Sequence, residues 1–524
     1  MSGPLVVVGD TLLDRDVDGR VDRLCPDAPV PVLAEESATD RPGGAGLAAL
    51  LAAADGHDVA LVTALADDPA GARLTALLTA AGVRLYPLPL PGATPEKIRL
   101  RTGGRTLLRL DRGGDAQPPG EPPDAALEIL AGAGAILVSD YGRGVAGLSA
   151  IRQALAGSTA PVVWDPHPRG PAAVPGSRLV TPNEGELFRL TGDAGSGPRL
   201  SGVARAARLL RDRWRAAAVA VTMGGDGSLL CHNGGAPLVV PAPVAATGDT
   251  CGAGDRFAVA AAAALADGAL LSEAVEEAVR VASTYVAAGG AATLPGPTGA
   301  ATLPGPAGPG GSHAAAGAGG SHAAAGSHAA ARPGGARDVA GAVADGGHPV
   351  GAPGVDGDGR EAASAVLART RANGGTVVAT GGCFDLLHAG HLATLRAARR
   401  LGDCLVVCLN SDRSVAELKG PGRPLTPQAD RAGLLAALDC VDAVVIFDEP
   451  TPQAVLSWLR PDIWVKGGDY ARGADPDQPD LPEAEQVRRW GGETVLVPYL
   501  DGRSTSGTIA AARAGDRQLA EGRR

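Results

Sequence analysis

The sequence predicts an α/β protein with two domains that are joined by a segment of low complexity. Over residues 5–292, short β-branched runs alternate with Ala- and Leu-rich amphipathic stretches, which is the pattern of an α/β domain with a largely parallel sheet. The same alternation returns in a smaller unit over 361–524. A chain of 524 residues is also too long for one ordinary hydrophobic core.

The first domain, 1–292, contains five clear candidates for strands. They are short, rich in β-branched and other apolar residues, and followed by amphipathic stretches. These strands are Leu5–Val8, Val59–Thr63, Ala135–Ser139, Pro161–Trp164 and Val219–Thr222.

Residues 293–360 are expected to form a flexible linker. The segment Gly-Ser-His-Ala-Ala-Ala occurs at 311–316, 320–325 and 326–331, within a Gly/Ala/Pro-rich stretch. Such a composition buries too little apolar side chain to offset the entropy lost on ordering. His313, His322 and His328 suggest a metal site, but no acidic or Cys partner accompanies them, and repeat duplication also explains their spacing.

The second domain, 361–524, opens with a predicted helix over Glu361–Arg371. Apolar runs of strand length follow it at intervals that leave room for helices. The predicted strands are Thr376–Thr380, Leu405–Leu409, Val444–Phe447 and Ile463–Val465.

Composition and charge argue against several classes of protein. The net charge of −10 and the absence of a long Lys/Arg run argue against general nucleic-acid binding. Seven scattered cysteines fit neither a zinc site nor a disulfide framework. The N-terminus lacks a signal-peptide pattern and no stretch resembles a membrane span. We therefore expect a cytoplasmic protein with no membrane partner.

The segment 247–255, Thr-Gly-Asp-Thr-Cys-Gly-Ala-Gly-Asp, precedes a long Ala-rich helical pattern. Glycines before a helix N-terminus expose backbone N–H groups to phosphate oxygens, and an Asp there can act as a general base. Taken alone, the segment is also compatible with a simple Gly-rich cap. It resembles, however, the signature of the ribokinase-like PfkB carbohydrate kinases. That resemblance implies Asp255 as the base and Gly252, Ala253 and Gly254 as the anion hole.

Further segments occur in the order seen in PfkB kinases, and the likeness covers 5–292. Some of them are similar to the heptose 7-phosphate kinase branch, which implies a sugar phosphate substrate. Asp10 and Asp14 follow the first strand, where the carboxyl ends of an α/β sheet form a ligand crevice. The sugar-binding candidates are Asp10, Asp14, Gly43, Gly44, Lys97 and Arg99.

The same resemblance implies an ATP site at Asn183, Glu186, Thr222 and Gly224. Carboxylate and amide oxygens suit Mg²⁺, so we expect Glu186 to hold the ion through water. Asn183 followed by Glu184 is also a common helix cap.

Three residues depart from the kinase pattern. Leu47 stands where the family places a sugar-contacting Asn, and His167 stands where heptose kinases place Lys. Arg256 follows the expected base where a small Thr is common. These differences leave the exact substrate, and full kinase activity, open.

The second domain carries a pair of histidines at a predicted strand–helix junction. His388 and His391 follow a glycine turn, a spacing that places both imidazoles near one bound phosphate. The segment 380–391 resembles the HxGH nucleotidyltransferases, which have a Rossmann-like fold. In that family the two histidines stabilise charge on the α-phosphate while pyrophosphate leaves, so positioning and electrostatics are the catalytic terms.

Other segments over 372–512 are similar to heptose 1-phosphate adenylyltransferases. The resemblance implies that they bind ATP or a sugar phosphate. The candidates are Gly382, Phe384, Asp385, Lys419, Arg423, Lys466, Gly467, Gly468, Asp469, Ser504, Thr505 and Ser506.

Together, the two halves resemble fused enzymes of ADP-heptose synthesis that use ATP and Mg²⁺. The resemblance implies phosphorylation of D-glycero-D-manno-heptose 7-phosphate at carbon 1 and adenylyl transfer to heptose 1-phosphate. Two alternatives remain open: the same chemistry on another sugar phosphate or with another nucleotide such as CTP, and one domain that serves only for binding. A homodimer is also left open.

Overall fold

The computed structural model describes residues 3–113, 117–193, 195, 198–232, 235–243, 250–293, 358–467 and 482–498. Apart from its end residues, the expected linker lies outside the described residues, and so do its three histidines. Among the helices of the described residues, none has the length and apolarity needed to cross a membrane.

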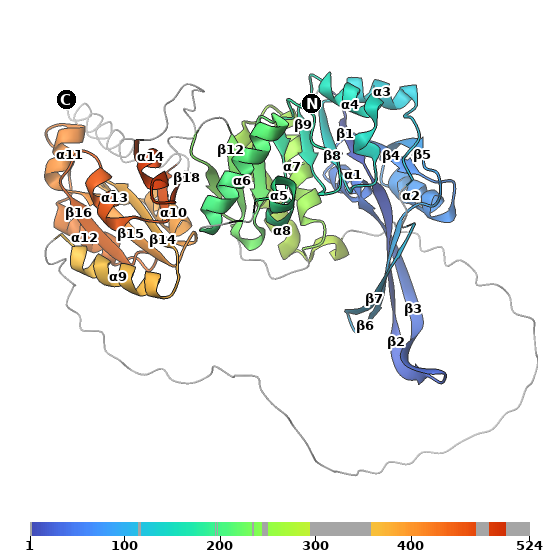
Figure 1. The fold of residues 1–524 in the computed structure, drawn as a ribbon, viewed down its shortest axis with the longest axis horizontal. Coiled ribbons are helices and arrows are strands. Elements are labelled where there is room, and N and C mark those ends of the chain that lie inside the picture. The colour runs from blue at the N-terminus through green and yellow to red at the C-terminus, as the bar shows by residue number, and fades with distance from the viewer. Residues whose placement is uncertain are drawn as a thin grey trace, which may run out of the picture. The chain divides into compact units, whose positions relative to one another are not determined.

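The N-terminal domain is built on a mostly parallel sheet, as the sequence predicts (Figure 1). Its strands follow the order β13-β12-β11-β10-β9-β8-β1-β4-β5. Pairs from β5 through to β11 are parallel, whereas β11–β12 and β12–β13 are antiparallel. The strands are β1 Leu5–Gly9, β4 Val59–Leu65, β5 Arg84–Pro89, β8 Ala135–Ser139, β9 Val162–Asp165, β10 Leu179–Val180, β11 Ala218–Thr222, β12 Ser228–His232 and β13 Leu238–Val240.

Helices cover both faces of this sheet. Successive side chains of a strand point to opposite faces, so each strand contributes apolar side chains to two buried clusters. In β1, Leu5 and Val7 join one buried cluster, whereas Val6 and Val8 join another. The helices are α1 Ala45–Ala54, α2 Pro69–Ala80, α3 Asp124–Ala131, α4 Ser149–Ala156, α5 Glu184–Thr191, α6 Arg199–Trp214, α7 Ala253–Ala266 and α8 Leu271–Ala287, with short 3-10 turns at Val145–Gly147, Gly224–Asp226 and Gly290–Thr293.

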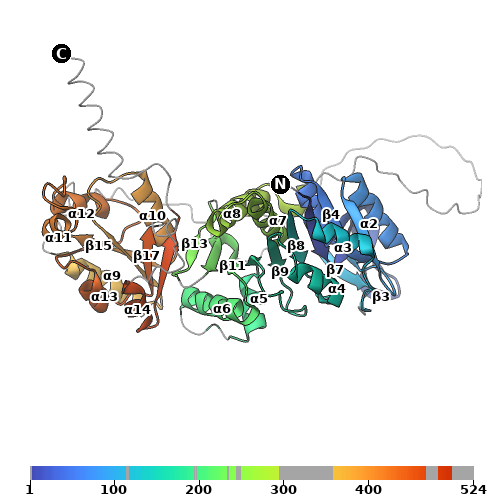
Figure 2. The same ribbon diagram turned by 90° about the horizontal axis from the view of Figure 1, so that it is seen from above.

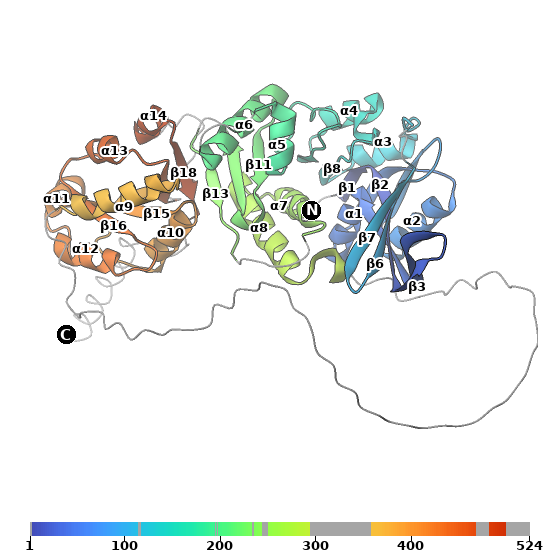
Figure 3. The same cartoon turned by 60° about the horizontal axis from the view of Figure 1, so that its bottom comes forward.

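A second sheet, not expected from the sequence, projects from the N-terminal domain as a long ribbon (Figures 1 and 3). Its order is β3-β2-β6-β7, in which β2 and β6 are parallel and the outer pairs are antiparallel. The strands are β2 Thr11–Cys25, β3 Ala28–Gly44, β6 Glu96–Thr102 and β7 Arg105–Arg112. Asp14 therefore lies within a strand, rather than in a loop after β1.

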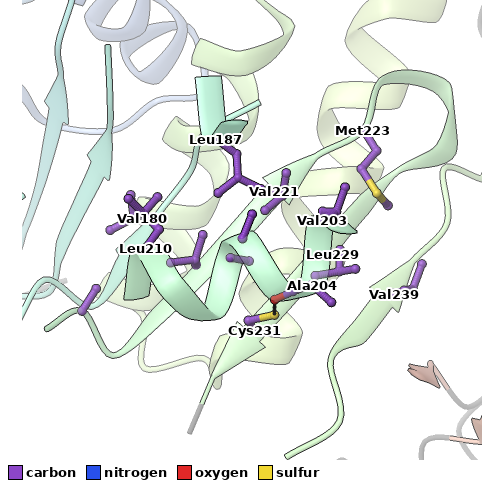
Figure 4. Packing of buried hydrophobic residues seen from close by; sticks show 14 of the residues in the cluster. Val180, Leu187, Val203, Ala204, Leu210, Val221, Met223, Leu229, Cys231 and Val239 are labelled. Carbon is purple, nitrogen blue, oxygen red and sulfur yellow. Dashed lines mark hydrogen bonds between the residues drawn. The ribbon is translucent and has the colours of Figure 1, made fainter. Parts of the chain in front are cut away.

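A compact apolar cluster supports the ends of β10 and β11 (Figure 4). It joins these strands to α5, α6, β12 and β13, and the thiol of Cys231 donates to the Ala204 carbonyl oxygen at 3.8 Å. The cluster includes Val180, Leu187, Val203, Ala204, Leu210, Val221, Met223, Leu229, Cys231 and Val239. It fixes the strand ends that carry Thr181 and Thr222.

The C-terminal domain has a parallel sheet of order β16-β15-β14-β17-β18 between helices (Figures 2 and 3). Trp464, Leu456 and Leu367 pack in one of its buried clusters. Its elements are α9 Arg360–Ala372, β14 Val377–Gly382, α10 Ala389–Arg399, β15 Cys404–Asn410, α11 Asp412–Lys419, α12 Gln428–Ala436, β16 Ala443–Phe447, α13 Gln453–Leu459, β17 Ile463–Gly467, α14 Pro482–Arg488 and β18 Glu493–Val497.

Candidate active sites

Asp255 lies in the first turn of α7 and is only 5% exposed. Burial raises its pKa to about 7. Gly252 precedes the helix with a φ of 79°, a conformation that favours glycine. A Cβ at this position would lie 2.8 Å from the Tyr285 hydroxyl and 2.9 Å from Leu47 Cδ2. The structure thus places a buried carboxyl beside the helix N-terminus formed by residues 252–254.

Asp10, at the end of β1, binds the loop that follows β8. Its carboxylate accepts hydrogen bonds from the backbone N–H groups of Tyr141, Arg143 and Val145 at 3.1, 2.8 and 3.1 Å. Both carboxylate oxygens are therefore engaged with this loop. Asp10, which we expect to bind the sugar, therefore also holds the backbone of this loop in place.

Tyr141, in the same loop, points its hydroxyl at Asp255. The hydroxyl oxygen lies 3.1 and 3.0 Å from the two carboxylate oxygens. The Lys97 ammonium from β6 lies 5.6 Å from the centre of the Tyr141 ring. The sequence analysis gave Tyr141 no role at the site, because 114 residues separate it from Asp255 and local spacing gives no sign of the contact.

The remaining sugar candidates meet where β2, β3 and β6 lie side by side. Arg99 donates to Asp14 at 2.9 Å, while burial lowers the pKa of Lys97. A Cβ at Gly43 would come within 2.4 Å of an Asp14 carboxylate oxygen, and one at Gly44 within 2.4 Å of the Asp10 carbonyl oxygen. Both glycines are thus needed for the close approach of β3 to the two acidic residues.

The ATP candidates lie at the ends of neighbouring strands. Asn183 caps α5, accepting from the Glu186 N–H at 2.9 Å, while the Glu186 carboxylate accepts from the Asn183 N–H at 2.9 Å. This capping box is the helix-cap alternative that the sequence left open. Burial raises the pKa of Glu186, and Asn183 forms an isolated parallel bridge with Thr222.

A cavity of about 160 Å³ joins this region to the N-terminus of α7. Thr222, Gly224, Ala253 and Gly254 contribute to its lining, together with the apolar side chains of Phe257, Val279 and Val286. The cavity offers an apolar wall for a base and backbone amides for phosphates.

The three residues that depart from the kinase pattern have distinct surroundings. Leu47 is buried in α1 beside Gly252. Arg256 forms an ion pair with Asp55 at the end of α1. The ring of His167 accepts a hydrogen bond from the Arg169 N–H at 3.2 Å, and burial, followed by the charge of Arg169, lowers its pKa.

In the C-terminal domain, His388 and His391 stand together at the N-terminus of α10. Their rings are stacked with centroids 3.9 Å apart, and the Phe384 ring lies 5.1 Å from His391. Burial, then the charges of His388 and Lys419, lowers the pKa of His391 to about 4. The two imidazoles are therefore juxtaposed as the sequence pattern predicts, and His391 is neutral near pH 7.

Asp385 orders the segment that carries Arg423. Its buried carboxylate pairs with the Arg423 guanidinium and accepts from the Leu425 and Thr426 N–H groups at 2.6 and 3.2 Å. Burial acts to raise the pKa of Asp385, but these hydrogen bonds hold it below its ordinary value. Asp385 thus positions Arg423 beside the histidine loop.

A cavity of about 420 Å³ is lined by most of the remaining candidates of this domain that the structure describes. Its lining includes Gly382, Phe384, Asp385, His391, Lys419, Lys466 and Gly467. Lys466 pairs with Glu483 at 3.0 Å, and its ammonium lies 5.3 Å from the Trp464 ring. Gly468, Asp469, Ser504, Thr505 and Ser506 lie outside the described residues.

Arg431 is a fully buried cation that ties the walls of this cavity together. Its guanidinium donates to the carbonyl oxygens of Thr426, Cys383 and Asn410 at 2.9, 2.6 and 2.8 Å, and to the Asp412 carboxylate at 2.7 Å. The sequence analysis assigned it no role, because its partners are spread over several loops.

Two family models match different parts of the chain. Residues 4–298 match the pfkB family of carbohydrate kinases, and residues 379–504 match the cytidylyltransferase-like family. The chain is 52% identical to the "Bifunctional protein HldE" of Streptomyces coelicolor, covering 98% of this chain and 97% of that protein. It is 36% identical to the protein of that name from Azorhizobium caulinodans, covering 97% and 98%. Among solved structures, Arabidopsis thaliana ribokinase complexed with ribose and ATP is similar, with a TM-score of 0.44, 25% identity and coverage of 55% of this chain and 93% of that one.

Proposed function

Because this chain belongs to the pfkB carbohydrate kinases and, over nearly its whole length, to the bifunctional HldE proteins, we propose that it catalyses two steps of ADP-heptose synthesis. The first step phosphorylates D-glycero-D-manno-heptose 7-phosphate at carbon 1 with ATP. The second transfers the adenylyl group of ATP to heptose 1-phosphate and releases pyrophosphate. A different enzyme must remove the 7-phosphate between the two steps.

The kinase step rests chiefly on one observation: Asp255 is buried at a helix N-terminus that also lines the cavity of about 160 Å³. The carboxylate accepts the proton of the carbon 1 hydroxyl as its oxygen attacks the γ-phosphorus of ATP, and ADP leaves. The amides of residues 252–254 face the phosphoryl oxygens, whose charge they stabilise together with the positive end of α7.

Mg²⁺ would accompany ATP in this site and neutralise its phosphate charge. Among the described residues, no cluster of three or more His, Cys, Asp or Glu side chains is arranged to hold a metal ion by itself. The carboxylate of Glu186 would suit a contact with the ion through water, and burial raises its pKa while no cation is bound. The Asn183 amide oxygen already accepts from the Glu186 N–H, so Asn183 acts mainly through the capping box.

In the adenylyl transfer, an oxygen of heptose 1-phosphate attacks the α-phosphorus of ATP. The stacked His388 and His391 donate to the phosphoryl group, which carries more charge in the transition state than in bound ATP. Lys419 and Arg423 hold phosphate oxygens, with Arg423 oriented by Asp385. The cavity takes up the nucleotide between the histidines and Lys466.

Another nucleotide remains the second candidate, since the C-terminal domain matches a family described as cytidylyltransferase-like. The intact protein should be incubated with heptose 1-phosphate and each nucleoside triphosphate, followed by mass spectrometry of the products. ADP-heptose as the main product supports the proposal. CDP-heptose as the main product would replace ATP by CTP in the second step.

Cellular location and assembly complete the proposal. All seven cysteines are described and none forms a disulfide, which supports a reducing cytoplasm.

The edge strand β7 exposes Leu107, Leu108 and Leu110, which favours a homodimer through the second sheet. Light scattering on the purified protein would distinguish a dimer from a monomer.

The kinase assignment is tested by Asp255→Asn, a substitution of nearly equal volume that removes the base. Sugar phosphorylation should fall to background while adenylyl transfer in the same chain is unchanged. Asp58→Asn is the matched control, because it removes an exposed carboxylate that pairs with Arg84. Kinase turnover of Asp255→Asn within tenfold of wild type would remove Asp255 from its proposed role.

A further inference from the structure

The loop after β8 places a phenol directly against the proposed base. Tyr141 donates from its hydroxyl toward both oxygens of Asp255, at 3.1 and 3.0 Å. A phenol carries one hydrogen, which here is shared between the two oxygens, whereas an ionised carboxylate can only accept. The contact therefore favours the ionised form of Asp255 and limits rotation of its carboxylate.

The backbone of Tyr141 is fixed by a hydrogen bond to Asp10. Its backbone N–H donates to Asp10, which also binds the N–H groups of Arg143 and Val145. A continuous set of hydrogen bonds thus runs from Asp10, at the end of β1, through the loop to Asp255 on α7. Displacing the loop would move the hydroxyl that contacts the base.

Other charged groups face Asp255 from the neighbouring elements. Lys97 on β6 lowers its pKa, whereas Asp14 on β2 raises it. Asp165, at the end of β9, is coupled to Asp255 by charge and has a raised pKa. Burial and two carboxylates oppose the ionisation of Asp255, whereas the hydrogen bond from Tyr141 and the charge of Lys97 favour it.

We propose that Tyr141 is a positioning residue for phosphoryl transfer, whose hydroxyl holds the Asp255 carboxylate ionised and oriented toward the sugar hydroxyl. This inference rests on the proposed role of Asp255 as the base. During transfer, the bond from carbon 1 oxygen to the γ-phosphorus forms and the bond from that phosphorus to ADP breaks. The sugar proton passes to Asp255, and Tyr141 keeps its own proton because burial and the charge of Asp255 raise its pKa well above the ordinary value.

The test is the pH dependence of kcat/KM for the kinase step in the full chain with Tyr141→Phe. Loss of the donor disfavours the ionised carboxylate, so the acid limb should move up by about one to two pH units. Well above this limb, the rate should recover toward wild type. Ionisation of the sugar phosphate and of ATP is common to both proteins and cancels in the comparison.

Two further variants of this chain test the inference even if Tyr141→Phe folds poorly. Incorporation of 3,5-difluorotyrosine at position 141 preserves shape but strengthens donation, so the acid limb should move to lower pH. Tyr86→Phe removes a hydroxyl on β5, outside the residues of this site, and should leave the limb in place.

An acid limb that stays at its wild-type position in well-folded Tyr141→Phe, or in the difluorotyrosine protein, overturns the inference and leaves Tyr141 with a packing role. The base assignment is judged separately. If Asp255→Asn is inactive while the limb of Tyr141→Phe does not move, only the role of Tyr141 fails. If Asp255→Asn remains active, the proposed kinase mechanism fails with it.

Discussion

Burial, followed by the charge of His388, whose ring centroid lies 3.9 Å away, lowers the pKa of His391 to about 4. In the proposed adenylyl transfer, we expect His391 to meet the phosphate as a neutral hydrogen-bond donor at neutral pH. Such a donor contributes most where charge develops during the reaction. We therefore expect the stacked pair to stabilise the transition state more strongly than it stabilises bound ATP.

His388→Ala and His391→Ala should each lower kcat for adenylyl transfer by about 10²–10³, the usual effect of removing one transition-state donor. The affinity for ATP should change much less. Rates at saturating ATP, melting curves and kinase activity are measured together. His57→Ala, in the turn after α1, is the control. Variants that melt early but turn over normally would show a structural pair, and the HxGH assignment would then be wrong.

At the scale of elements, apolar strands followed by amphipathic stretches could be located from the sequence alone. β8 has its predicted bounds, and β1, β4, β9 and β11 differ by a residue or two at their ends. The second sheet was missed because β2 and β3 alternate with charged residues, which resemble a solvated loop. Long-range ion pairs such as Arg15–Asp40 and Arg41–Asp16 stabilise them, and local patterns contain no sign of such pairs.

The residues of the candidate sites fall into a local group and a long-range group. Local motifs, such as 252–255 and 388–391, could be recognised from the sequence because all their residues lie in one short segment. Tyr141 and Arg431 could not be assigned a role, because each acts on residues that only the folded chain brings near. The glycines at 43 and 44 were expected for sugar binding, whereas the structure shows a close approach of strands that requires them.

The contribution of such long-range hydrogen bonds to stability can be measured at Arg431. Arg431→Met keeps much of the side-chain volume but leaves carbonyl oxygens in three loops without their donor. The variant should lose roughly 3–5 kcal/mol of stability in the C-terminal domain and raise KM for ATP. Arg413→Ala, which removes an exposed pair with Asp448, should cost less than about 1 kcal/mol.

Urea unfolding followed by tryptophan fluorescence, together with adenylyl transfer rates, checks the Arg431 prediction. Kinase activity in the same chain reports whether the loss is confined to the C-terminal domain. Equal losses in Arg431→Met and Arg413→Ala would mean that the buried guanidinium stabilises no more than a surface charge does.

At the scale of the whole molecule, the two proposed reactions use different residues, different cavities and different sugar phosphates. Asp255 and its helix belong to residues 1–297, whereas the histidine pair and Lys466 belong to residues 358–467. The C-terminal domain also has an apolar cluster of its own, in which α9 packs against β15 and β16. Because an intermediate dephosphorylation separates the two steps, neither site needs the other for its chemistry.

Fragments 1–297 and 354–524, expressed separately, should therefore each fold and retain their half-reaction with kcat and KM within about threefold of the intact chain. The second fragment begins before α9, because the Asp358 carbonyl oxygen accepts from the Ile446 N–H at 2.9 Å and a later cut would remove that contact. An equimolar mixture of fragments, supplied with the required phosphatase, should make ADP-heptose at the rate of the intact protein, since a linker that only joins the domains adds no catalytic group. Circular dichroism and melting curves establish folding before the rates are compared. A well-folded fragment that regains activity only when the other is added would show that the domains depend on each other, and the proposed independence would be wrong.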